Sequence, residues 1–113
     1  MNMDTAIVEL LDAIKTDYAA WHALARDRVN SAIKDKMIAE FNASLRVEPG
    51  RKYIKIVSGG SVWGFIVDAE GDKFPRGSIL KAAGWATPAR NHARGNILSG
   101  GYTVKWTGPL YMN

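Results

Sequence analysis

The densest cluster of polar side chains in this chain follows Trp85. It is the run Thr87-Pro88-Ala89-Arg90-Asn91-His92-Ala93-Arg94-Gly95-Asn96. Guanidinium groups suit bidentate contacts with phosphate oxygens, and an indole offers a stacking plane worth ~1–3 kcal/mol per nucleobase. An asparagine amide can read a polar edge of a base or ribose. Together these residue types predict a binding site for an anionic, nucleotide-like ligand.

The basic residues of this region have no acidic residue within their own segment of the sequence to neutralise them. After Asp72 the chain has no Asp or Glu, yet it carries Lys73, Arg76, Lys81, Arg90, Arg94 and Lys105. Residues 1–44 hold five bases and seven acids, a net charge of −2, whereas residues 45–113 hold ten bases and four acids, a net charge of +6. This asymmetry favours an anionic partner. The predicted ligand-binding residues are Trp85, Arg90, His92, Arg94, Asn96, Lys81 and Lys105.

Each of the main candidates also has a purely structural interpretation. The tryptophan can belong to the core, and the asparagine can cap the end of a helix. The two arginines can be solvated, or they can reach back to Asp12 or Asp17 in the N-terminal segment. The sequence leaves these alternatives open.

Catalytic and metal-binding patterns are weak in this sequence. There is no cysteine, and the two histidines, His22 and His92, stand far apart. Four serines, at positions 58, 61, 78 and 99, lie beside glycines in expected turns, with no nearby acid to orient a base. The acidic run at residues 68–72 lacks the twelve-residue pattern of a calcium loop. We therefore expect a non-enzymatic protein with no metal and no cofactor.

Length and composition predict one globular domain over residues 1–113. The chain is 47% hydrophobic and 23% charged, as is usual for soluble proteins. No apolar run approaches the ~20 residues needed to cross a bilayer, so no membrane partner is expected. The first fifteen residues carry acids where a signal peptide would carry bases. Together with the missing cysteines, this indicates a cytoplasmic protein.

The N-terminal part, residues 1–44, is predicted to be helical. Apolar residues recur at helical spacing in two stripes: Ile7, Leu11, Ile14, Tyr18, Trp21 and Ala25, then Val29, Ile33, Met37 and Phe41. Asp4 is the expected N-cap. The register of the stripes slips near residues 27–31, which favours two helices over one rod. Two such stripes offer more apolar surface than a small sheet covers, so we expect a homo-oligomer.

From Leu45 onward the periodicity is that of strands. Residues 51–57 alternate like a half-buried strand, and residues 62–67 are rich in β-branched and aromatic side chains. A glycine-containing turn lies between the two segments, which predicts a β-hairpin. Further short strands are expected at residues 79–83 and 102–106. Thr87-Pro88 is a helix-start signal that predicts a short helix near residues 88–94, whose free amides would attract an anion. The predicted fold is α+β: an N-terminal helical layer packed on a small, mainly antiparallel sheet.

The residues of this cluster and of the C-terminal segment resemble those of a known protein family. Residues 81–85 (KAAGW), Pro88-Ala89, the run Ala93-Arg94-Gly95-Asn96-Ile97 and residues 106–111 (WTGPLY) are similar to a family of small proteins from tailed bacteriophages. The shared pattern is KAAxWxxPAxxxxRGNI, and the likeness covers roughly residues 38–113. The resemblance implies a phage accessory protein acting in the cytoplasm of the host cell, and it assigns no mechanism.

Three functions fit these observations. The leading hypothesis is a protein that binds an anionic nucleotide, acting as an anti-defence sponge that sequesters a host immune signal. The second is sequence-nonspecific DNA or RNA binding through the same face, extended by Lys52, Lys55 and Lys105. The third is inhibition of a host protein, with the helical stripes or exposed aromatic residues making the contact.

Overall fold

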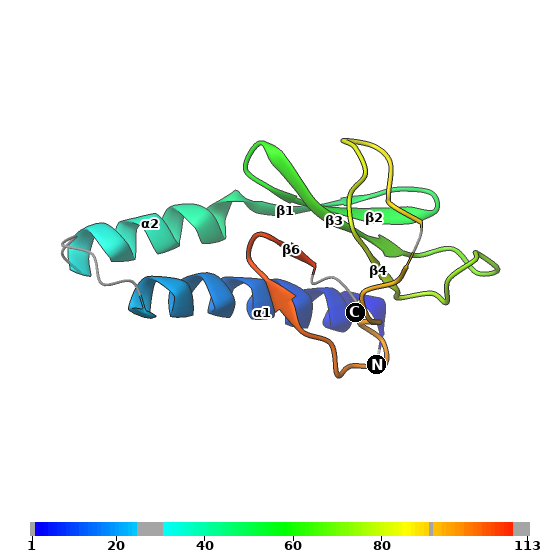
Figure 1. Cartoon of the computed structure of the whole chain (residues 1–113), viewed down its shortest axis with the longest axis horizontal. Helices are drawn as coiled ribbons and strands as arrows, with labels where there is room; N and C mark the ends of the chain where they lie inside the picture. The colour runs from blue at the N-terminus through cyan, green and yellow to red at the C-terminus, as the bar shows by residue number, and fades with distance from the viewer. Residues whose placement is uncertain (1, 25–30, 91, 110–113) are drawn as a thin grey trace.

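The computed structural model describes residues 2–24, 31–90 and 92–109 (Figure 1). The elements in chain order are α1 (Met3–Leu24), α2 (Ser31–Ser44), β1 (Leu45–Pro49), β2 (Tyr53–Ser58), β3 (Ser61–Val67), β4 (Ile79–Leu80), β5 (Val104–Lys105) and β6 (Gly108–Pro109). The expected α+β class is confirmed, because α1 packs on a four-stranded antiparallel sheet of order β1-β2-β3-β4.

Helix α1 covers the sheet through the stripe that its sequence predicted. Ile7, Ile14 and Tyr18 are buried, and Leu11 is partly buried against the same core. Trp21, which continues the stripe, is 50% exposed because it lies near the end of α1 that projects beyond the sheet (Figure 1). Ala25 lies outside the described residues.

The N-cap of α1 is Asn2, so the expected cap at Asp4 is wrong. Asn2 Oδ1 accepts a hydrogen bond from the backbone N–H of Thr5 at 2.8 Å. This bond satisfies one of the amides that the first turn of a helix leaves free. Asp4 instead lies inside the first turn, where its charge complements the positive end of the helix dipole.

Helix α2 runs back beside α1, as Figure 1 shows, so the chain forms two helices rather than one rod. The Phe41 ring stacks on Tyr18 of α1 with centroids 4.0 Å apart. Farther from the sheet, Ile33 and Met37 of the second stripe are 49% and 39% exposed. Val29 and the segment 25–30 lie outside the described residues.

The predicted hairpin is present as β2 and β3. Its turn pairs Ser58 with Ser61, and Gly59 adopts a φ of 58°, a conformation that favours glycine. Strand β1, which the sequence analysis did not predict, follows directly on α2 and pairs with β2 from Leu45 to Pro49. The third predicted strand is shorter than expected and spans Ile79–Leu80 as β4.

Apolar side chains fill both faces of the sheet. On the α1 face, Ile54, Ile56 and Ile66 join the main core. On the other face a second cluster forms around Phe65, Val67 and Leu80, covered by Tyr53, Val62, Phe74, Ala82 and Ala93. The loops after β3 and β4 therefore act as a second cover, opposite the helices.

A small hairpin of β5 and β6 closes the core beside α1. The strand expected at residues 102–106 is present in short form as β5, whereas β6 was not predicted. Trp63 Nε1 donates a hydrogen bond to the Lys105 carbonyl at 2.8 Å, and the Trp106 N–H donates to Asp17 Oδ2 at 2.9 Å. These two bonds fix the hairpin between the sheet and α1.

Candidate functional site

The segment that carries the predicted site forms an irregular hairpin with β4. Ala82 pairs with Pro88, and Ser78 pairs with Asn96, in isolated antiparallel bridges. The N–H of Ala89 donates to the Lys81 carbonyl, and the N–H of Arg94 donates to the Ile79 carbonyl, both at 2.7 Å. The returning chain thus runs along the edge of β4 that β3 leaves free.

This path replaces the short helix expected near residues 88–94. The described residues of that range, 88–90 and 92–94, are not helical. The amides of Ala89 and Arg94 bond to the carbonyls of Lys81 and Ile79, at and just after β4. The proline that suggested a helix start sits in a β-bridge, a position that needs no N–H. The anion site expected at a helix N-terminus therefore has no helix to support it.

Trp85 stands at the tip of this hairpin. The N–H groups of Ala83 and Gly84 both donate to the Thr87 carbonyl, at 2.8 and 3.0 Å, and close the turn beneath it. The indole is 52% exposed, so the interpretation of Trp85 as a core residue is not what the structure shows. The ammonium of Lys55 lies 4.6 Å from the centroid of its ring, within range of a cation–π interaction.

Two hollows flank Trp85 on the outer face of the sheet. One has a volume of about 340 Å³ and is lined by Gly60, Ser61, Val62, Ala82, Ala83, Gly84 and Trp85 itself. The other, of about 290 Å³, adjoins the next residue, Ala86, and is lined by Glu48, Pro49, Gly50, Arg51, Lys52, Tyr53, Lys55, Phe65 and Ala86. An exposed indole thus lies beside a small-residue hollow and close to a cationic one, in which Arg51, Lys52 and Lys55 outnumber the single acid Glu48. Lys55 Nζ is 3.9 Å from Glu48 Oε1.

Arg90 binds an acid of the chain itself. Its NH2 group is 3.0 Å from Asp72 Oδ1, and the Arg90 carbonyl accepts a hydrogen bond from Lys73 Nζ at 3.1 Å. In the same loop, Arg76 donates to Asp68 Oδ1 through both Nε and NH2. The acids at residues 68 and 72 thus oppose cations that seemed unopposed in the sequence.

Arg94 is 93% buried, which is unusual for an arginine. Its Nε donates to the His92 carbonyl at 3.3 Å, while its backbone N–H serves the pairing with β4. The structure places neither Arg90 nor Arg94 at an aspartate of α1. Asp17, one of the two acids considered, bonds to Trp106 instead.

Asn96 is occupied by hydrogen bonds within the chain. Its Nδ2 donates to the Arg76 carbonyl at 3.0 Å, and its Oδ1 accepts from the N–H groups of Leu98 and Ser99 at 2.8 and 3.3 Å. Next to it, Gly77 has a φ of 92°, and a side chain there would collide with the Asn96 oxygen. The amide therefore ties the loop after β3 to the turn after the returning strand.

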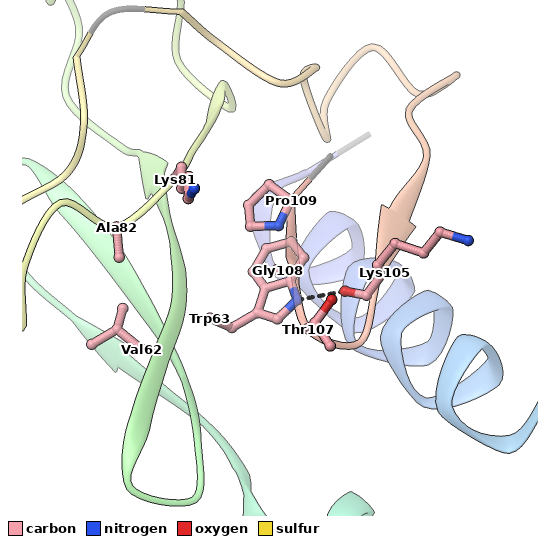
Figure 2. Close-up of a pocket in the computed structure, with 8 residues that line it drawn as sticks. All are labelled: Val62, Trp63, Lys81, Ala82, Lys105, Thr107, Gly108 and Pro109. Atoms are coloured by element: carbon pink, nitrogen blue, oxygen red, sulfur yellow. Dashed lines mark hydrogen bonds between the residues drawn. The ribbon is translucent and has the colours of Figure 1, made fainter. Parts of the chain in front are cut away.

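The remaining predicted residues are spread over the surface. His92 is exposed. Lys81 and Lys105 line a different cavity of about 250 Å³, beside Trp63 and Pro109 (Figure 2). Figure 2 shows that Lys105 contributes its backbone to this cavity while its ammonium points away. The seven predicted residues therefore do not converge on one pocket.

Sequence reasoning missed a second aromatic site. Trp21 of α1 and Trp106 of the β5–β6 turn lie 85 positions apart, yet their ring centroids are 5.5 Å apart. Tyr18, His22 and Phe41 join them in one cluster. The only local signal was the helical spacing of Tyr18 and Trp21 in the first apolar stripe, which predicted helix packing rather than a site.

Titration and metal chemistry add little to the site. Burial, with a smaller contribution from the negative charge of Glu9, raises the pKa of the Tyr102 phenol above its usual 10.0. In the described part of the chain, no three His, Cys, Asp or Glu side chains gather as metal ligands would. Neither described helix has the length and hydropathy needed to cross a bilayer.

A comparison with protein families matches residues 1–112 to a family of unknown function, DUF7717. The chain belongs to this family. The match includes helix α1, so it extends beyond the region of the bacteriophage resemblance. No curated protein and no solved structure matches the chain.

Proposed function

We propose that this DUF7717 member is a non-enzymatic protein that binds single-stranded nucleic acid without sequence preference. Trp85 stacks on an unpaired base, while Lys55 and its neighbours Arg51 and Lys52 hold the phosphates. Stacking on an exposed aromatic ring, combined with a cationic groove along the backbone, is the usual basis of such binding. Every base has a π face, so this mode discriminates little between sequences.

The observation that carries this proposal is the environment of Trp85. An indole that is 52% exposed at the tip of a tight turn leaves apolar surface in water with no structural benefit from burial. Lys55 is positioned against its ring, and the cationic hollow adjoins the same turn. An unpaired base that stacks here places its phosphates near these cations.

A small signalling nucleotide is the second candidate ligand. The hollow of about 340 Å³ beside Trp85 supports it, because its small residues let a phosphate approach the backbone. The open surface around Trp85 suits a longer nucleic-acid strand better. The residues expected to hold a small nucleotide are committed elsewhere, because Arg90 is paired, Arg94 is buried and Asn96 is bonded within the chain. In the phage context that the sequence resemblance implies, the first ligand suggests a nucleic-acid coat and the second an anti-defence sponge in the host cytoplasm.

The test is fluorescence anisotropy with a labelled oligothymidylate. Trp85→Ala should weaken binding about 5- to 150-fold, the equivalent of ~1–3 kcal/mol of stacking. Lys55→Met should weaken it less and flatten the salt dependence, since each phosphate neutralised on a single strand contributes about −0.7 to the log–log slope. Lys36→Met on α2, which removes one exposed charge far from the sheet, is the matched control.

Two results would contradict this proposal. One is oligonucleotide affinity unchanged by Trp85→Ala, and the other is an equal loss caused by Lys36→Met. Cyclic dinucleotides titrated in the same assay separate the two ligands. A large thermal shift with a small nucleotide that depends little on salt, without oligonucleotide binding, would favour the sponge.

A further inference from the structure

A further cavity, which Trp85 does not line, lies between α1 and the β5–β6 hairpin. Its volume is about 410 Å³, and it is lined by Asp17, Ala20, Trp21, Lys105, Trp106 and Thr107. Asp17, Ala20 and Trp21 come from α1, and the others come from the hairpin. Nothing in the proposed nucleic-acid function uses these residues.

Two indoles in contact form one wall of this cavity. The rings of Trp21 and Trp106 are 5.5 Å apart and tilted by 57°, so they make a single bent aromatic surface. Tyr18 supports it from behind, with centroids 6.2 Å from Trp21 and 5.0 Å from Trp106. Half of the Trp21 side chain is exposed although it belongs to a well-packed cluster. The wall is held rigidly and is open to a ligand.

A carboxylate stands at the edge of this wall. Asp17 Oδ2 accepts the backbone N–H of Trp106 at 2.9 Å, which fixes the side chain next to the indoles. Among the described residues, Asp17 takes part in no ion pair. A half-buried acid that is positioned but not paired attracts a cation from outside.

From this juxtaposition we propose that the cavity binds an arginine side chain of a partner protein. The negative face of an indole attracts a cation. A guanidinium is planar and weakly hydrated, and it stacks on aromatic rings while donating to a carboxylate, whereas an ammonium is a compact, strongly hydrated point charge. Tryptophan and arginine are both enriched among the residues that contribute most to binding at protein interfaces.

Lys105 limits what this site accepts. Lys105 lines the cavity, and its positive charge opposes the binding of a further cation nearby. We therefore expect the site to prefer a partner segment with one arginine flanked by uncharged or acidic residues. Removing the Lys105 charge should strengthen the binding of arginine.

The arginine site and the Trp85 surface lie on opposite sides of the sheet. Helix α1 covers the face formed by Ile54 and Ile56, whereas Trp85 contacts Lys55, which points to the other face. A partner protein and a nucleic-acid strand can therefore be bound together. The arginine site stands independently of the proposed nucleic-acid function.

The experiment compares two capped peptides, Gly-Arg-Gly and its citrulline counterpart, which has the same shape without the charge. Binding is followed in the full chain by NMR of the four indole N–H signals. The arginine peptide should shift the signals of Trp21 and Trp106 in a saturable way and leave that of Trp85 in place. The citrulline peptide should bind more weakly.

The decisive variant is Asp17→Asn. The amide oxygen can still accept the Trp106 N–H, so the hairpin stays in place while the charge is lost. Affinity for the arginine peptide should fall about two- to fivefold, as expected for a partly exposed ion pair, and affinity for the citrulline peptide should not change. Lys105→Met should raise arginine affinity, and Asp12→Asn, an exposed acid on the same helix, should have no effect.

Three outcomes would overturn the proposal. Equal affinity for both peptides would show that the cavity does not recognise the positive charge of arginine. An absence of shifts at Trp21 and Trp106 at millimolar peptide would mean that no arginine binds. A dimer in light scattering that dissociates in Asp17→Asn would identify a second copy of this chain as the occupant.

Discussion

The role of a single residue in this protein depends on its neighbours in space more than on its residue type. Arg90 and Arg94 are four positions apart and looked equivalent in the sequence. Asp72 lies 3.0 Å from Arg90, and the two residues form an ion pair. Arg94 belongs to the returning strand and is 93% buried. Trp85 was equally ambiguous, since no local pattern separates an indole of the core from one at the tip of a turn.

His22 is a buried polar residue whose imidazole makes no hydrogen bond to the described residues. It is 3% exposed, and neither ring nitrogen has a hydrogen-bond partner among the described residues. Its ring packs edge-on against Tyr18 and Trp21 at 4.7 and 5.0 Å. Such a group has lost its bonds to water and gained none in return.

We therefore expect His22→Phe to stabilise the protein. Phenylalanine has a similar shape and no polar atom, so removal of the unsatisfied group should raise the free energy of unfolding by about 1–2 kcal/mol. Urea denaturation followed by far-UV circular dichroism measures the difference. His22→Gln, which keeps a polar group in the same apolar site, is the control and should give no gain. A destabilised phenylalanine variant would show that the imidazole has a partner in solution.

Among the elements, the regular ones were predicted and the short ones were not. Strands β2 and β3 were predicted from local patterns: alternation in residues 51–57, a β-branched and aromatic run in residues 62–67, and a glycine-containing turn between them. Strand β1 carries few apolar residues and ends in a proline, and β6 has two residues. Their pairing depends on partners elsewhere in the chain, so the sequence near them carried little signal.

The short helix near residues 88–94 shows how tertiary pairing overrides a local signal. Thr87-Pro88 is compatible with a helix start, but it is equally compatible with a turn followed by a strand edge. The carbonyls of Ile79 and Lys81, at and just after β4, accept the amides of Arg94 and Ala89. The segment therefore pairs with β4 and does not form a helix. The α+β class was predictable, whereas the local geometry of the candidate site was not.

At this scale Asn96 is expected to hold elements together rather than contact a ligand. Asn96→Ala removes three hydrogen bonds that join the loop after β3 to the turn after residue 96. We expect stability to fall by about 1–3 kcal/mol, with oligonucleotide affinity unchanged under conditions where the variant is folded. Asn96→Asp keeps the acceptor and loses the donor, so it should cost less. A variant of full stability with weakened binding would return Asn96 to the ligand site.

The whole molecule separates its charges and its apolar surfaces. Helix α1 carries Asp4, Glu9, Asp12 and Asp17 against the single base Lys15. The basic residues Arg51, Lys52 and Lys55 belong to the opposite face and its adjoining turn. Figure 1 shows the pair of helices projecting beyond the sheet, along the 49 Å length of the molecule. A cationic face and an acidic helix on one small domain suit simultaneous contact with two different partners.

The projecting helices also leave apolar side chains in water, and for this reason we expect the protein to self-associate. Ile33 and Met37 lie one helical turn apart on α2 and are 49% and 39% exposed, beyond the reach of the sheet. Two copies that pack these turns together would bury the side chains at about 25 cal/mol per Å² of apolar surface. Light scattering at tens of micromolar should therefore report more than one copy. Met37→Lys combined with Ile33→Lys should give a monomer, whereas Val8→Lys, at a residue of α1 that is 57% exposed, should not. A monomeric mass for the unaltered chain across this concentration range would show that the exposed stripe serves another contact.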